Sequence, residues 1–246
     1  MTAIPEQELK DFVNQHIDLF HNLRIKKLSA TKLKDLLKRK NPYLFKAKSI
    51  NTAGKLVEEL LGAVLSSSEE KFMGDFLESL AVFVVHRLYD GVKSGVAGVD
   101  LEFTKNGIRY LVSVKSGPNW SNAPSYRQQI TELHTAVAVI RQGFKGQVEP
   151  VIGVCYSKVA TSNRNMVTHV YGQEFWRLLS DDPNFYTTIV EPIGFRAKQH
   201  NDTFEEEKGR LVNKFTLEFI NDFCDSDRAI DWEKLVRFNS GDLIAT

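Results

Sequence analysis

The sequence lacks the features that mark exported, disulfide-bonded or membrane-spanning proteins. It has only two cysteines, Cys155 and Cys224, and neither has a partner at the spacing of a zinc site. A disulfide framework is therefore not supported, and a reducing compartment is expected. No apolar run reaches the roughly 18 residues of a membrane-spanning helix, and the first residues are polar and acidic, unlike those of a signal peptide. We expect a cytoplasmic protein with no membrane partner.

The sequence also lacks a large net charge of either sign. Its 32 lysines and arginines nearly balance 31 acids, so there is no general attraction to polyanions. Locally, however, the segment from Arg24 to Lys48 holds ten basic residues against one acid. Such a surface can bind nucleic-acid phosphates, with Lys38, Arg39 and Lys40 as candidate contacts. A solvated helix face is the alternative interpretation of the same charges.

Internal repeats and low-complexity linkers are absent as well, which favours a compact chain. Apolar residues recur every three or four positions through about residue 65, so we expect a helical N-terminal region over 1–65 that binds DNA or mediates dimerisation. Residues 66–246 would form the main core, with helical elements at the C-terminal end. A separate long helix is predicted to begin at a capping serine, Ser67 or Ser68, and to end near Gly91.

What the sequence does contain is a clear hairpin signal, GVDLEFTKNGIRYLVSVKSG, with Asn-Gly at the position of a two-residue type I′ turn. In the resulting register Asp100 lies opposite Ser113. Strand alternation then places four polar side chains on one face: Asp100, Glu102, Ser113 and Lys115. Desolvating such a group is costly, and Mg²⁺ would offset the repulsion between the acids. An exposed cluster of cross-strand charges is the alternative.

The remaining segments predict a mixed central sheet flanked by helices, an α/β fold. VEPVIGVCYSKV is typical of a buried strand, and MVTHVYGQEFWRLL of a strand followed by a helix after Gly172. The amphipathic segment FEEEKGRLVNKFTLEFINDFC predicts a helix whose apolar stripe serves dimerisation or packs on the protein's own sheet.

The order of Asp100 and Ser113-Val114-Lys115 resembles the motif of the PD-(D/E)xK nuclease superfamily. This resemblance implies a restriction-endonuclease-like fold in which Asp100 binds metal and Lys115 orients or activates the attacking water. Ser113 occupies the place of the family's second acid and would not be a nucleophile. Some restriction endonucleases with Ser-x-Lys recruit a glutamate from a helix, and here Glu78 ranks first and Glu102 second.

Glu132 is a third option for that acid, although an ordinary helix-surface role suits it better. Glu78 has an alternative of its own, that of a core carboxylate satisfied by a hydroxyl or by Lys115.

Four further blocks resemble type II restriction endonucleases: GVDLEF, YLVSVKSGPNWSN, SSSEEKFMGDFLESLA and YGQEFWRLL. The resemblance implies Mg²⁺-dependent hydrolysis of double-stranded DNA at a specific short sequence, with Mn²⁺ as a substitute ion. It also implies a homodimer in a bacterial or archaeal cell whose own DNA is protected by a cognate DNA methyltransferase.

The loop and helix start that follow the hairpin are predicted to contact DNA, because amides and guanidinium groups bind base edges and phosphates. The candidates are Asn119, Trp120, Ser121, Asn122, Arg127 and Gln128. An ordinary turn with a buried tryptophan is the alternative. Two other functions share these features: a structure-specific repair or recombination nuclease, and a non-catalytic DNA-binding protein with a degenerate metal site.

Overall fold

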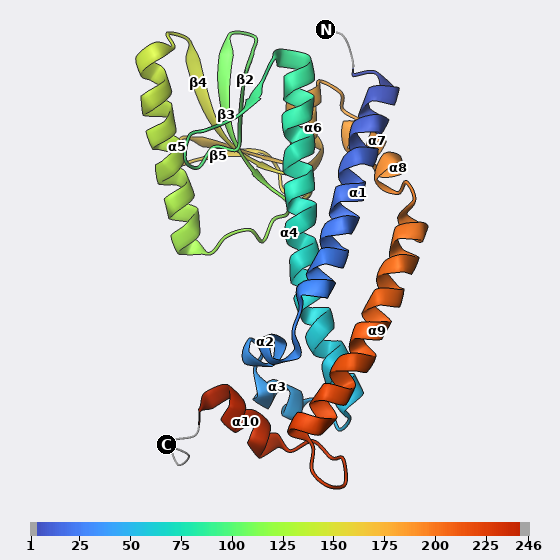
Figure 1. Ribbon diagram of the computed structural model, residues 1–246. Coiled ribbons are helices and arrows are strands. Elements are labelled where there is room, and N and C mark those ends of the chain that lie inside the picture. Colours follow the sequence, from blue (N-terminus) through green and yellow to red (C-terminus); the bar gives the residue numbers. More distant parts are fainter. Residues whose placement is uncertain (1–3, 242–246) are drawn as a thin grey trace. The chain divides into compact units, whose positions relative to one another are not determined.

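The computed structural model describes residues 4–241, in which ten helices accompany one six-stranded sheet (Figure 1). The helices are α1 Glu6–Ala30, α2 Leu33–Lys38, α3 Pro42–Ala47, α4 Ala53–Tyr89, α5 Ala123–Gly143, α6 Gly172–Ser180, α7 Phe185–Thr188, α8 Val190–Ile193, α9 Ala197–Phe223 and α10 Trp232–Ser240. The strands are β1 Val92–Lys93, β2 Leu101–Lys105, β3 Ile108–Lys115, β4 Gln147–Val154, β5 Ser162–Arg164 and β6 Val167–Tyr171. No helix within the described range is long and apolar enough to cross a membrane.

The chain divides into two compact units at positions other than the expected boundary after residue 65. One unit holds the sheet and comprises the described residues up to Asp18 together with Met73–Phe195. The other comprises Leu19–Phe72 and the residues from Arg196 on, and in the described part it is entirely helical apart from loops and one isolated β-bridge. The C-terminal helices therefore group with the N-terminal helical segment, whereas the sequence assigned them to the main core.

The predicted helix start at Ser67 or Ser68 is wrong, because α4 continues through both serines without a break. The two hydroxyls donate backwards along the helix instead of capping a new one. Ser67 Oγ donates to the carbonyl of Ala63 at 3.1 Å, and Ser68 Oγ donates to that of Val64 at 2.9 Å. This i−4 bonding lets serine remain inside a helix.

The predicted hairpin is confirmed in both turn and register. Asn106 and Gly107 have φ angles of 52° and 80°, the positive values that a type I′ turn requires. Leu101 pairs with Val112 across the antiparallel ladder. The sheet has the order β1-β2-β3-β4-β6-β5. The pairs β3–β4 and β4–β6 are parallel, whereas β1–β2, β2–β3 and β5–β6 are antiparallel.

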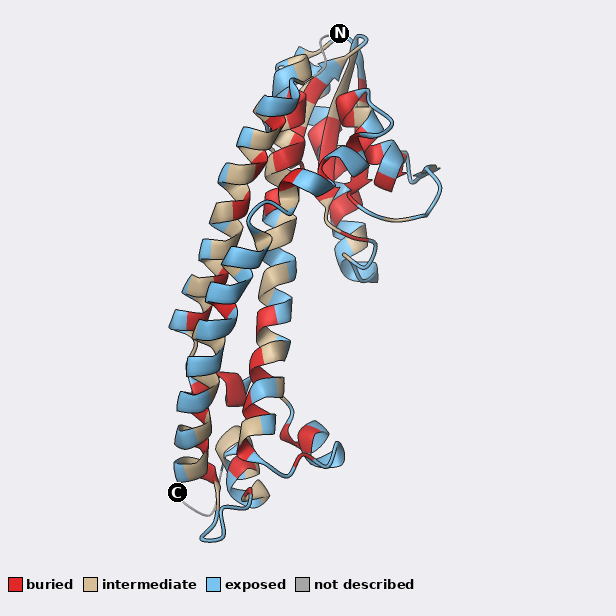
Figure 2. Ribbon diagram, turned by 90° about the vertical axis from the view of Figure 1, so that its right-hand side faces the viewer, coloured by how far each residue is buried: buried red, intermediate tan, exposed pale blue. Residues whose placement is uncertain are grey.

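Helices cover both faces of this sheet, as the α/β prediction requires. On one face, apolar residues of α1, α4 and α6 pack against alternate residues of β2 and β3, such as Phe103 and Val112. On the other face, the stripe of α5 packs against Leu111 and Ile152. Figure 2 shows buried residues in the strands of the sheet and also along the helices. The mixed sheet and its flanking helices agree with a restriction-endonuclease-like fold.

The helical unit has a separate core that explains the apolar stripe of α9. Phe204, Phe215, Phe219 and Phe223 pack against apolar residues of α2, α3 and the first part of α4. The stripe is therefore buried by helices of its own unit, and the alternative in which it packs on the sheet is wrong.

Candidate active site

Asp100 lies directly before β2, beside the carboxyl end of the antiparallel strand β3. Its own N–H donates to the carbonyl of Val112 at 2.9 Å, which extends the hairpin ladder by one bond. Its Oδ2 atom accepts the backbone N–H of Val114 at 2.6 Å and lies 3.2 Å from Ser113 Oγ. The strand pairing thus holds one carboxylate oxygen in place, while the half-buried residue still reaches solvent.

Ser113 is almost fully buried and joins Asp100 to the neighbouring helix. Its hydroxyl lies 3.1 Å from Oε1 of Gln129 on α5, so its single proton can be donated to either Asp100 or Gln129. Nε2 of Gln129 donates to the carbonyl of Gly98 at 2.7 Å, which fixes the orientation of the amide. The backbone before Asp100, the strand β3 and the helix α5 are therefore held together by one buried hydrogen-bond network.

Lys115 is the last residue of β3 and lies at the same end of the hairpin as Asp100. Its Nζ atom is 5.2 Å from the centroid of the Trp120 ring, a cation–π distance. Trp120 is itself half-buried against the core on the α5 face. The tryptophan ring thus supports the lysine side chain, and the predicted contact of Trp120 with DNA stays a prediction.

Glu78 lies on α4, the helix that packs on the opposite face of the sheet from α5. A Cβ atom at Gly74 would lie 3.6 Å from Cβ of Ser116, so this face of α4 passes close to the residue after Lys115. Glu78 is one turn further along the same face. Its Oε1 atom accepts from Lys93 Nζ at 2.9 Å, on the edge strand β1.

The hydrogen bond to Glu78 raises the pKa of Lys93 above its ordinary value, as does the charge of that carboxylate. The negative charges of Asp100 and Asp75 raise it further. Lys93 therefore lies in a field produced by three acids, two of them from α4 and one from the hairpin. Of the acids that the sequence places around a metal, Asp100 and Glu78 act on the same lysine, whereas Glu102 is not among the acids that shift its pKa.

The two other candidates for the missing acid have different partners. Glu102 is largely buried and its Oε2 atom accepts from Arg109 at 2.8 Å. Glu132 accepts from the side chain of Gln128 at 2.8 Å on the surface of α5. Glu78 and Glu102 both pair with a cation, but Glu102 and Arg109 are only 12% and 32% exposed, whereas Glu78 and Lys93 are 26% and 70% exposed, so the Glu78 carboxylate is the more accessible to an ion from solvent.

The described residues contain no group of three or more histidine, cysteine, aspartate or glutamate side chains placed to hold a metal ion. This finding is compatible with magnesium, which keeps several waters and commonly binds through one or two carboxylates plus substrate phosphates. Asp100 and Glu78 supply oxygen ligands of the required kind, and a cationic group already lies among these acids. The residues present therefore fit Mg²⁺ or Mn²⁺ better than a cation that needs a complete protein cage.

The predicted DNA-contacting residues of the sheet unit are mostly exposed around the start of α5. Asn119, Ser121, Arg127 and Gln128 all have exposed side chains. Asn122 caps α5 instead: its Oδ1 atom accepts the N–H of Ser125 at 3.0 Å, and Ser125 Oγ accepts the N–H of Asn122. That side chain is used to begin the helix, whereas the other four remain exposed.

The basic segment lies in the helical unit, and part of its charge is structural. Arg24 is buried and pairs with Glu69 at 2.6 Å. Lys34 pairs with Asp222 at 3.3 Å, and Lys48 pairs with Glu59. These three cations therefore have partners within the helical unit.

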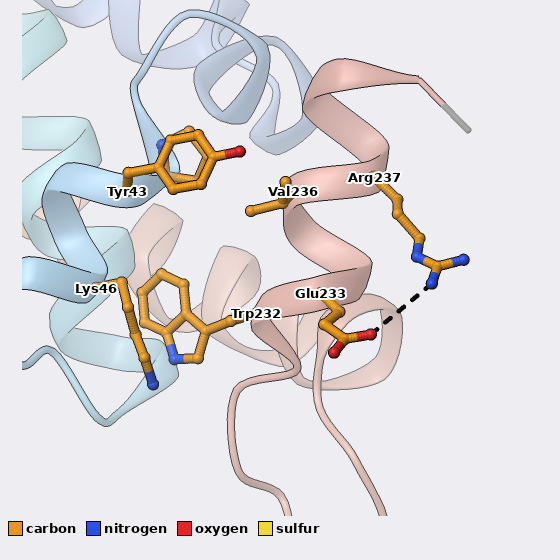
Figure 3. A pocket seen from close by; sticks show the side chains of 7 residues that line it. Tyr43, Lys46, Trp232, Glu233, Val236 and Arg237 are labelled. Carbon is orange, nitrogen blue, oxygen red and sulfur yellow. Dashed lines mark ion pairs between the residues drawn. The ribbon is translucent and has the colours of Figure 1, made fainter. Parts of the chain in front are cut away.

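Lys38 and Arg39 remain exposed, and Lys40 is half-buried. Near them a pocket of about 420 Å³ opens between α3 and α10, with Tyr43 and Trp232 among its walls (Figure 3). Lys46 Nζ lies 5.3 Å from the Trp232 ring centroid at the same pocket.

Two residues of this site were not predicted from the sequence. Gln129 is the buried amide, whereas the sequence singled out its exposed neighbour Gln128. Its spacing from Leu133 and Ala136, at i+4 and i+7, would have placed it on the buried stripe of α5. Lys93 gave no such signal, because a two-residue edge strand between turns has no readable periodicity.

The mixed sheet with an acid and a lysine at one end of its central hairpin defines the core of a restriction-endonuclease-like nuclease. Residues 7–201 match the type II restriction endonuclease EcoO109I family, and the chain belongs to that family. No curated protein matches the sequence. The family confirms the predicted class of enzyme and implies that its substrate is DNA.

Proposed function

We propose that the protein cleaves double-stranded DNA at a specific short sequence in a reaction that depends on Mg²⁺, with Mn²⁺ as a substitute. The observation that supports this proposal is the placement of Asp100 and Lys115 at the paired ends of β2 and β3, together with the ion pair that joins Glu78 of α4 to Lys93 on the adjacent strand β1. When bound, the metal supplies positive charge to the phosphate undergoing hydrolysis and lowers the pKa of water.

Each residue has a role that follows from its surroundings. Asp100 offers its second carboxylate oxygen to the metal, because Val114 and Ser113 hold Oδ2. Lys115 orients the attacking water and stabilises negative charge that develops on the phosphate, since its ammonium group is supported above Trp120. Ser113 positions Asp100 and is not a nucleophile, because its buried hydroxyl faces two acceptors.

Glu78 takes the place of the second acid, and this assignment separates it from Glu102. Glu78→Gln is expected to lower the rate of cleavage by about 10²-fold or more, the scale of losing one charged transition-state contact. Glu102→Gln is expected to retain cleavage, because the Glu102 carboxylate is less exposed than that of Glu78 and is held by Arg109. Both variants change one carboxylate to an amide, so each is the matched control of the other. A greater loss of cleavage in Glu102→Gln would reverse the assignment.

Each unit, taken by itself, carries candidate DNA contacts. The exposed side chains of Asn119, Ser121, Arg127 and Gln128 would lie along the strand being cut, and Lys38, Arg39 and Lys40 would bind phosphates. Cleavage of both strands at a two-fold site is most simply achieved by a homodimer with one active site in each subunit. A DNA methyltransferase of matching specificity would protect the host.

The direct test is incubation of the purified protein with DNA of known sequence in Mg²⁺ and in EDTA, followed by mapping of the fragment ends. Discrete Mg²⁺-dependent fragments with a common end sequence are expected. Cutting only at junctions or branched structures would favour a repair or recombination nuclease. Tight DNA binding without cleavage in either Mg²⁺ or Mn²⁺ would favour a non-catalytic DNA-binding protein, and both results would overturn the proposal.

A further inference from the structure

Lys93 forms an ion pair with Glu78, one of the proposed metal-binding acids, and the proposed catalytic mechanism gives it no role. It lies on β1, where it pairs with Leu101, the residue after Asp100. Its ammonium group is 2.9 Å from Glu78 Oε1. A lysine on the edge strand β1 thus places its positive charge next to the Glu78 carboxylate on α4.

The strength of this ion pair is limited by solvent. The Lys93 side chain is 70% exposed and that of Glu78 is 26% exposed. Exposed pairs contribute little to stability, because water screens them and both long side chains must be ordered. A divalent cation offers the same carboxylates twice the charge in a smaller ion, so it can replace the ammonium group.

We infer that Lys93 is an internal counter-ion of the active-site acids, which neutralises Glu78 and the nearby acids when no metal is bound and competes with the divalent metal for them. The inference rests on the proposed metal site at Asp100 and Glu78. Lys93 is accordingly a positioning residue that sets how tightly the site holds metal, and it does not contact the reacting phosphate.

The test measures Mn²⁺ binding to the full-length, DNA-free protein, by the electron paramagnetic resonance signal of free Mn²⁺ and by the Mn²⁺-dependent rise in melting temperature. Lys93→Gln is expected to tighten the dissociation constant about three- to tenfold, because it removes a positive charge that repels the ion at close range. Lys93→Arg keeps the charge and is expected to retain the wild-type dissociation constant.

Lys10→Gln is the matched control for net charge. Lys10 also forms an exposed ion pair with a glutamate, Glu6 at 2.6 Å, but on α1. Its replacement changes the net charge of the protein by the same amount and should leave Mn²⁺ affinity unchanged. Melting curves recorded in EDTA establish that each variant is folded before metal is added.

Asp100→Asn separates failure of this inference from failure of the proposed metal site. If Asp100→Asn binds Mn²⁺ as tightly as the wild type, or if the wild type binds none, the metal site is wrong and the role of Lys93 falls with it. If Asp100→Asn loses binding while Lys93→Gln binds with unchanged or weaker affinity, the metal site stands and the counter-ion role alone is overturned. Tighter binding by Lys93→Gln but not by Lys10→Gln supports both.

Discussion

Replacing Ser113 with alanine tests the buried network that positions Asp100. Ser113 is 1% exposed, and removal of its hydroxyl leaves Oε1 of Gln129, a residue that is 8% exposed, without the donor at 3.1 Å. A buried acceptor that loses its partner costs about 1–3 kcal/mol. Asp100 keeps the shorter bond from the Val114 N–H. Ser113→Ala should therefore lose about 1–3 kcal/mol of unfolding free energy while retaining more cleavage than Asp100→Ala.

Urea unfolding monitored by circular dichroism measures the first effect, and cleavage of plasmid DNA under single-turnover conditions measures the second. Ser67→Ala is the matched control, because its hydroxyl is exposed and bonds only to its own helix. It should be neutral or slightly stabilising, since alanine has the higher helix propensity. The reasoning is refuted if Ser113→Ala is as stable as the wild type, or if its cleavage is as slow as that of Asp100→Ala.

Two further predictions concern the surroundings of the site. Gly98→Ala should reduce both stability and cleavage, because φ is +76° at Gly98 and an added Cβ would overlap Glu132; thermal melts and cleavage rates check this. Burial lowers the pKa of His169 below 6.5. In the neutral ring, Nε2 accepts from Tyr126 Oη at 3.2 Å and Nδ1–H donates to the Val167 carbonyl. The stability that the neutral ring contributes should be complete above pH 6.5 and be lost as pH falls through the folded pKa. The difference in melting temperature between wild type and His169→Gln should therefore shrink on acidification, and a constant difference would contradict this.

The hairpin could be predicted in detail because its information is local. Asn106 and Gly107 specify a turn with two positive φ angles, and the turn then fixes which residues pair along both strands. Since side chains alternate along a strand, Asp100, Ser113 and Lys115 could be assigned to one end and one face from the sequence. The catalytic motif is contained within this single supersecondary unit.

The features that sequence analysis missed depend on contacts between distant segments. The continuity of α4 through Ser67 and Ser68 could not be predicted, because a serine hydroxyl can either cap a new helix or donate to the i−4 carbonyl inside an existing one. The grouping of α9 with the N-terminal helices depends on which apolar faces meet in space. Lys93 could not be found for the same reason, since its importance comes from the approach of Glu78 on another element.

The account rests on Lys115 as the residue that enables hydrolysis once DNA is bound. The most direct measurement compares wild type and Lys115→Ala for DNA affinity in EDTA and for single-turnover cleavage of the same DNA in Mg²⁺. Because Lys115 is a single half-buried residue supported by Trp120, its loss should leave DNA affinity unchanged and abolish cleavage. Mg²⁺-dependent cleavage by Lys115→Ala at the wild-type rate would contradict the central claim.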